Sequence, residues 1–155
     1  MRATSFNWLT FNQPRQDRTA ASVGGVVENF TAAASLNTGD CVFLSAANTV
    51  NKSTTAANYA GFIGVVVGGQ LTNNNITSNI GVAAAGANQS VLVQISGIAN
   101  VVAGGTVTPG TNFSVVPDAA TAGRVVAGTT AGQVLGTTVS AGTAAGTMKI
   151  VLNHR

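Results

Sequence analysis

The stretch "SVLVQISGIANVV", residues 90–102, alternates side chains in the manner of a strand with one buried face. Val91, Val93 and Ile95 recur with a period of two and therefore lie on the same side of a pleated strand. The same alternation returns in "TMKIVL", residues 147–152, at Met148, Ile150 and Leu152. Both stretches therefore predict strands with one face toward a hydrophobic core.

Further short apolar runs occupy the chain from Val23 onward, separated by glycine and by Asn/Thr clusters. With the two stretches above they make nine runs, which also include "GGVVENF", "DCVFL", "GFIGVVVG", "NITSNIGVA", "TNFSVV", "GRVVAG" and "GQVLGTTV". Many short strands with turn signals between them are typical of an all-β sandwich or barrel and not of βαβ units. We therefore predict an all-β fold: a small β-barrel or sandwich of short strands with an extended N-terminal arm.

The segments between the runs are assigned from their composition. Residues 45–60 and 70–75 are rich in Asn, Thr and Ser and are predicted to be exposed loops. Residues 117–121 have room for one short helical turn at most. The glycine spacings drift instead of keeping one period, so the sequence does not predict a repeat array.

Composition favours strands and a single domain. Valine outnumbers leucine 21 to 7 among 155 residues, and 19 glycines supply turn and bulge positions. A chain of this length buries a sufficient core without metals or disulfides, and its one cysteine, Cys41, excludes an internal disulfide. We predict an arm over residues 1–22 and one domain over residues 23–155.

Charge is scarce along the whole chain. It has seven basic and four acidic residues and a net charge of +3, and Lys52 is the sole charged residue between Asp40 and Asp118. A soluble domain ordinarily carries charge on about a quarter of its residues, so we expect partner molecules to cover much of this surface. Seven scattered basic residues do not form the dense stripe that a nucleic-acid partner requires. No apolar run is long enough for a signal peptide or a membrane span, so the sequence predicts synthesis in a cytoplasm and no membrane partner.

The residue types that carry chemistry are few and separated. Cys41 and His154 would need Asp40 as orienter to act as a nucleophile and base, but a cysteine within "DCVFL" is more often a small buried residue. One His, one Cys and four isolated carboxylates make no metal-ligand cluster, and the glycine runs lack the Lys-Ser/Thr of a phosphate loop. The sequence therefore predicts a protein that is not an enzyme and holds no cofactor.

The predicted arm is unlike the rest of the chain. Residues 5–12, "SFNWLTFN", hold three of the eight aromatic residues and the only tryptophan. Aromatic side chains suit an arm that orders on a neighbouring molecule and fills pockets there. The alternative is that residues 5–12 form the first strand of the domain's own core.

The motifs "GFIGVVVG", "VLVQISGIANVVAGGTVTPGTNFSVV" and "GRVVAGTTAGQVLGTTVSAGTAAGTMKIVLN" together resemble the capsid cement, or head decoration, proteins of tailed bacteriophages. In this pattern a "V-x-V-x-I-S-G" strand precedes a "G-T-x-V-x-P-G-T" turn, a "G-x-V-L-G" strand and a short last strand. The likeness extends from Gly61 to Leu152, and residues 1–38 have no counterpart in it. Members of this family are small β-barrel-like proteins without enzymatic activity that bind the outside of an expanded capsid, commonly as trimers and in some members as dimers.

The resemblance implies a virion protein that binds the major capsid protein on the outer capsid surface and cements neighbouring capsomers, with a trimer favoured over a dimer. Combined with the aromatic arm, it leads us to expect capsid contacts from Arg2, Phe6, Trp8, Leu9, Phe11, Arg15 and Arg18. A glycan-binding or fibre-type adhesin is the alternative, because it would also be all-β, rich in Asn and Thr, and poor in charge. Its sugar site would use exposed aromatics, for which Trp8 and Tyr59 are the candidates.

Overall fold

The computed structural model describes residues 25–53, 61–71, 80–130 and 133–152, which contain twelve strands and no α-helix. The strands are β1 (Val27–Ala32), β2 (Leu36–Asn37), β3 (Cys41–Ala46), β4 (Thr49–Lys52), β5 (Phe62–Gly69), β6 (Ala83–Ala85), β7 (Ser90–Gln94), β8 (Ile98–Val102), β9 (Ser114–Pro117), β10 (Val125–Ala127), β11 (Gly136–Thr138) and β12 (Thr147–Leu152). The predicted all-β class is confirmed, while the predicted arm lies outside the described residues.

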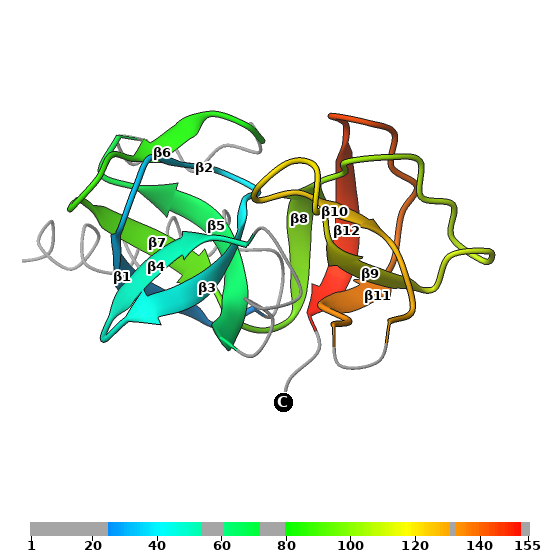
Figure 1. Ribbon diagram of the computed structural model, residues 1–155, viewed down its shortest axis with the longest axis horizontal. Coiled ribbons are helices and arrows are strands. Elements are labelled where there is room, and N and C mark those ends of the chain that lie inside the picture. The colour runs from blue at the N-terminus through cyan, green and yellow to red at the C-terminus, as the bar shows by residue number, and fades with distance from the viewer. Residues whose placement is uncertain (1–24, 54–60, 72–79, 131–132, 153–155) are drawn as a thin grey trace, which may run out of the picture.

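The strands form two units that lie side by side (Figure 1). In the first unit, β1 to β7, the sheet order is β1-β4-β3-β5-β7, and β1 pairs with both β4 and β7. Because each of these five strands has a neighbour on both sides, the sheet closes on itself and leaves no edge. The short strands β2 and β6 pair separately.

The second unit has five strands in the order β10-β9-β11-β12-β8. Its two edge strands approach each other through one parallel bridge between Ala103 and Val125, and the Gly104 N–H donates to the Val125 carbonyl at 2.7 Å. This sheet is therefore strongly curled and closed at a single point.

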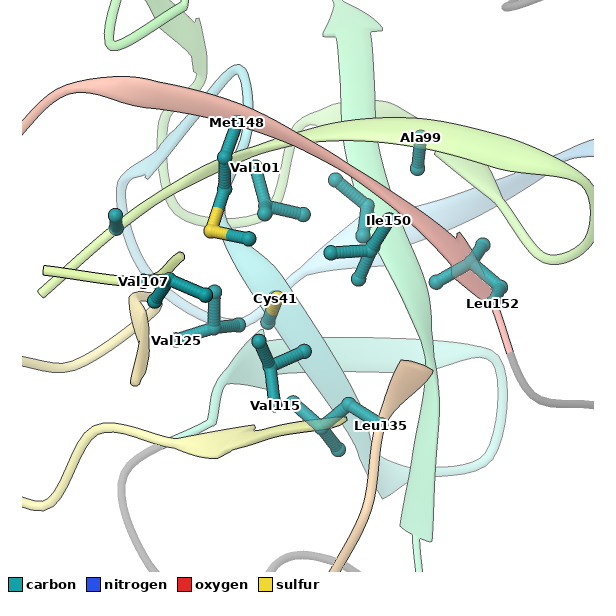
Figure 2. Close-up of a cluster of buried hydrophobic side chains, with 12 residues drawn as sticks. Cys41, Ala99, Val101, Val107, Val115, Val125, Leu135, Met148, Ile150 and Leu152 are labelled. Carbon is teal, nitrogen blue, oxygen red and sulfur yellow. The ribbon is translucent and has the colours of Figure 1, made fainter. Parts of the chain in front are cut away.

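Each unit encloses a hydrophobic cluster rich in Val and Ala. The first unit buries Val91 and Val93 in its cluster, and the second buries Met148, Ile150 and Leu152, so the alternation predicted at both stretches is confirmed. The cluster of the second unit also contains two residues of the first unit, Cys41 from β3 and Val65 from β5; Figure 2 shows Cys41 among the second unit's side chains. The two units therefore share part of one core.

The two units have the same strand topology. Strands β1, β3, β4, β5 and β7 correspond in order to β8, β9, β10, β11 and β12. In each unit the first strand pairs antiparallel with the last and is bridged in parallel to the third, and the other pairings are antiparallel. The chain is thus an internal duplication of one five-stranded arrangement.

Local details support this correspondence. Residues 27–39, "VENFTAAASLNTG", align without a gap with residues 98–110, "IANVVAGGTVTPG", and this alignment superposes Gly39 on Gly110, whose φ angles are 87° and 86°. Both glycines occupy the left-handed region that suits a residue without a Cβ. The Ala32 N–H donates to the Gln89 carbonyl at 2.9 Å, and the equivalent Ala103 N–H donates to the Gly146 carbonyl at 2.9 Å.

Three expectations from the sequence need correction. Residues 45–60 are not simply an exposed loop, because β4 occupies Thr49–Lys52 and buries Val50 completely. The run at residues 90–102 forms two strands, β7 in the first unit and β8 in the second, and a turn at Gly97 separates them. The drifting glycine spacings concealed the duplication, although the fold is not an array of stacked repeats.

Candidate functional site: the junction of the two units and an exposed apolar face

The residues predicted to contact a capsid all lie outside the described residues: Arg2, Phe6, Trp8, Leu9, Phe11, Arg15 and Arg18. Tyr59 and His154 lie outside them as well. Residues 70 and 71, part of the second predicted loop, are exposed as expected. Residues 117–121 contain the end of β9 and a bend, in which the Asp118 carboxylate accepts a hydrogen bond from the Ala120 N–H at 2.8 Å.

Cys41 is a packing residue and not an exposed nucleophile. Its side chain is fully buried in the shared core, where burial, and secondarily the charge of Asp40, raise the pKa of the thiol far above its ordinary value. A reactive cysteine needs an accessible thiolate, and both conditions oppose one. The alternative use of Cys41 with His154 therefore receives no support from the surroundings of Cys41.

Backbone hydrogen bonds join the two units around Gly123, in the turn that precedes β10. The Cys41 N–H donates to the Gly123 carbonyl at 2.8 Å, and the Gly123 N–H donates to the Ser53 carbonyl at 2.8 Å. The Ser53 N–H donates in turn to the Cys41 carbonyl at 2.8 Å, which completes the ring. Because these groups are buried, the bonds fix the turn of the second unit on the outer side of β3.

A cleft of about 270 Å³ opens beside this junction, with walls from both units. In it, Lys52 Nζ lies 3.0 Å from Asp40 Oδ2, which also accepts a hydrogen bond from the Asn37 N–H at 2.7 Å. Arg124 adds a second positive charge to the lining. Asp40 is nearly buried and is paired with Lys52 of the same unit, and the lining of the cleft offers no second carboxylate for acid–base chemistry.

The outer face of the second unit exposes large apolar side chains. Phe113 is 64% exposed, Val151 39% and Ile98 37%. Val151 lies directly opposite Ile98 on β8 and opposite Thr137 on β11, so these side chains share one face of the sheet. Sequence reasoning missed this face because only the strand register places Val151 beside Ile98 and Thr137.

Two other kinds of site were searched for in the described ranges. There, no three His, Cys, Asp or Glu side chains gather in a way that would hold a metal ion. The same ranges contain no helix with the length and apolar character needed to cross a bilayer.

Comparison with solved structures finds a similar fold in a bacteriophage protein. The crystal structure of the head fiber gp8.5 N base in bacteriophage phi29 superposes with a TM-score of 0.55 at 10% sequence identity, covering 83% of this chain and 94% of that chain. No protein-family model matches the chain, and no curated protein matches it. The similarity therefore shows a shared fold over nearly the full length of the phi29 head fiber base.

Proposed function

We propose that the protein is a non-enzymatic structural component of a bacteriophage head, which binds the outer capsid surface as a homo-oligomer and cements neighbouring capsomers. The fold shared with the phi29 head fiber base is the observation that carries this proposal, since it spans most of both chains. Fold alone does not determine function, so the properties of the surface have to agree with it.

The surface supports a role that consists of protein contacts. Eleven charged residues in 155 give little electrostatic protection against association, and the second unit exposes Phe113, Val151 and Ile98. On a virion such a surface is covered by neighbouring subunits. The buried thiol of Cys41 and the ion-paired Asp40 serve packing and not turnover.

Within this proposal, the arm, residues 1–22, supplies the anchors to the major capsid protein. Phe6, Trp8, Leu9 and Phe11 would fill apolar pockets, and Arg2, Arg15 and Arg18 would pair with acidic groups on the shell. A segment that orders on a neighbour adds contact area without enlarging the folded units.

Cosedimentation with capsids assembled from the major capsid protein of the same genome tests the proposal. We expect the full chain to pellet with expanded capsids, and a chain lacking residues 1–22 to keep its melting temperature but lose binding. A second variant replaces Phe6, Trp8 and Phe11 by serine and leaves the three arginines in place, so it isolates the contribution of the aromatic side chains. It should bind at least tenfold more weakly than the full chain, because apolar anchors dominate interface energies.

Two outcomes would contradict this account. Failure of the full chain to bind capsids, together with binding to a defined glycan on an array, would favour the adhesin function. Loss of the fold on deletion of residues 1–22 would instead show that the leading segment belongs to the domain's own core.

A further inference from the structure

The duplication allows each surface of one unit to be compared with its counterpart in the other. In the first unit, Cys41, Val65 and Gln94 lie directly opposite one another across β3, β5 and β7. They point away from the first unit's own cluster, and yet they are 0%, 0% and 1% exposed. Cys41 and Val65 are buried because they pack into the second unit's core.

The same row exists in the second unit and is uncovered. We call it the outward row: Ser114, Thr137, Val151 and Ile98, each paired with the next across β9, β11, β12 and β8. Its last two members are 39% and 37% exposed, and Thr137 is exposed as well. Next to the row, Phe113 takes the position that Asp40 holds in the first unit: the Thr138 N–H donates to the Phe113 carbonyl as the Val66 N–H does to the Asp40 carbonyl.

The turn that hydrogen-bonds to Cys41, at one end of the first unit's row, also has a counterpart in the first unit. This turn contains Gly123, with φ of 83°, and the equivalent turn between β3 and β4 contains Asn48, with φ of 53°. Residues 46–48 are exposed, and in Figure 1 the β3–β4 hairpin, in cyan, points away from the second unit. Within the described residues, each chain thus presents an exposed row on its second unit and an exposed turn on its first.

We infer that the outward row is the docking surface for the first unit of another copy of this chain, which binds it with the Asn48 turn as the Gly123 turn binds the first unit within a chain. The equivalent bonds would run from the Ser114 N–H to the Asn48 carbonyl, as a second bond beside the one that this carbonyl accepts from the Thr31 N–H of its own chain at 2.9 Å, and from the Asn48 N–H to the Gly128 carbonyl. Val151, Ile98 and Phe113 become buried in the contact. This inference specifies the homo-oligomer of the proposed function.

Such a contact is heterologous, because two different surfaces of the chain meet. Repetition of a heterologous contact builds a closed ring when the rotation between neighbours closes, and a filament when it does not. In either assembly the contact within the chain alternates with an equivalent contact between chains, so every unit is surrounded in the same way.

The first test is the mass of the purified protein by light scattering, with no capsid present. The wild type should be an oligomer, and Val151→Asp and Phe113→Asp should each shift it toward the monomer by at least a tenfold increase in dissociation constant. Val82→Asp is the matched control, because Val82 is 46% exposed on the first unit. The oligomer mass of this variant should equal that of the wild type. Phe113 is mostly exposed, so the Phe113→Asp variant should fold, which circular dichroism confirms.

The second test locates the contact by cross-linking. A backbone hydrogen bond between two residues brings their Cα atoms within the range of a disulfide, about 4.4–6.8 Å. The double variant Asn48→Cys with Ser114→Cys should therefore form disulfide-linked multimers under mild oxidation, and neither single variant should form more than a dimer. The native Cys41 is buried and should not compete.

A monomeric wild type, an unchanged mass in both aspartate variants, or a double variant without multimers would overturn the inference. None of these results depends on capsid binding. A chain that oligomerises through the outward row but ignores capsids would retain the inference and refute the proposed function.

Discussion

Two equivalent glycines provide a direct test of how tightly the structure packs around Gly39. Gly39 and Gly110 have φ angles of 87° and 86°, so an alanine at either position pays the same conformational penalty, about 1 kcal/mol. A Cβ on Gly39 would lie 2.8 Å from Ile80 Cγ2 and 3.2 Å from Val102 Cγ2, whereas a Cβ on Gly110 meets no atom within 4 Å. Overpacking of this kind costs a further 1–3 kcal/mol, roughly.

We therefore expect Gly110→Ala to lower the free energy of unfolding by about 1 kcal/mol, and Gly39→Ala to lower it by about 2–4 kcal/mol. For a chain of this size, these losses correspond to falls in Tm of about 3 °C and about 6–12 °C. Urea unfolding followed by circular dichroism, at one protein concentration for all variants, measures both. Equal losses in the two variants would refute the close contacts of Gly39 with Ile80 and Val102.

Three further predictions concern the junction and the core. Asp40→Asn removes the charge beside Lys52 but keeps an acceptor for the Asn37 N–H, so it should lower the free energy of unfolding in urea by about 1–2 kcal/mol. Adding Lys52→Met removes the unpaired cation and should recover part of that loss. No recovery would mean that the ion pair does not contribute to stability. Cys41, whose pKa burial raises, should resist iodoacetamide in the folded protein at pH 8 and react within minutes in urea, as followed by mass spectrometry; fast native labelling would contradict its burial. Ile150→Ala should cost about 3–4 kcal/mol, because the fully buried side chain leaves a cavity, and a loss below about 1 kcal/mol would show a core that collapses to fill it.

The strand content of this fold is predictable from the sequence because period-two alternation is a local signal. It identified β7 and β12 correctly through Val91, Val93 and Ile150. It failed at β4, where "TVNK" offers one apolar side chain, Val50, among polar residues. A strand with one buried residue has no alternation to detect.

The duplication and the outward row were beyond the reach of the sequence for a different reason. The separation of equivalent residues falls from 71 at the first strand, Val27 to Ile98, to 57 at the last, Gln94 to Val151, because the connecting loops differ in length. No fixed period survives such a change. Only the pairing register aligns "FIGVVV" with "VLGTTV" and places Thr137 beside Val151.

The side chains of the two equivalent rows differ because the two rows have different surroundings. The first unit carries Cys41 and Val65 where no water reaches, and the second carries Ser114 and Thr137 at the same two positions, beside the half-exposed Val151. A permanently solvated row would favour charged side chains, and a permanently buried one would resemble the first unit. The mixture of hydroxyl and aliphatic groups suits a surface that must remain soluble after synthesis and become buried on assembly, as interfaces formed by separately folded chains do.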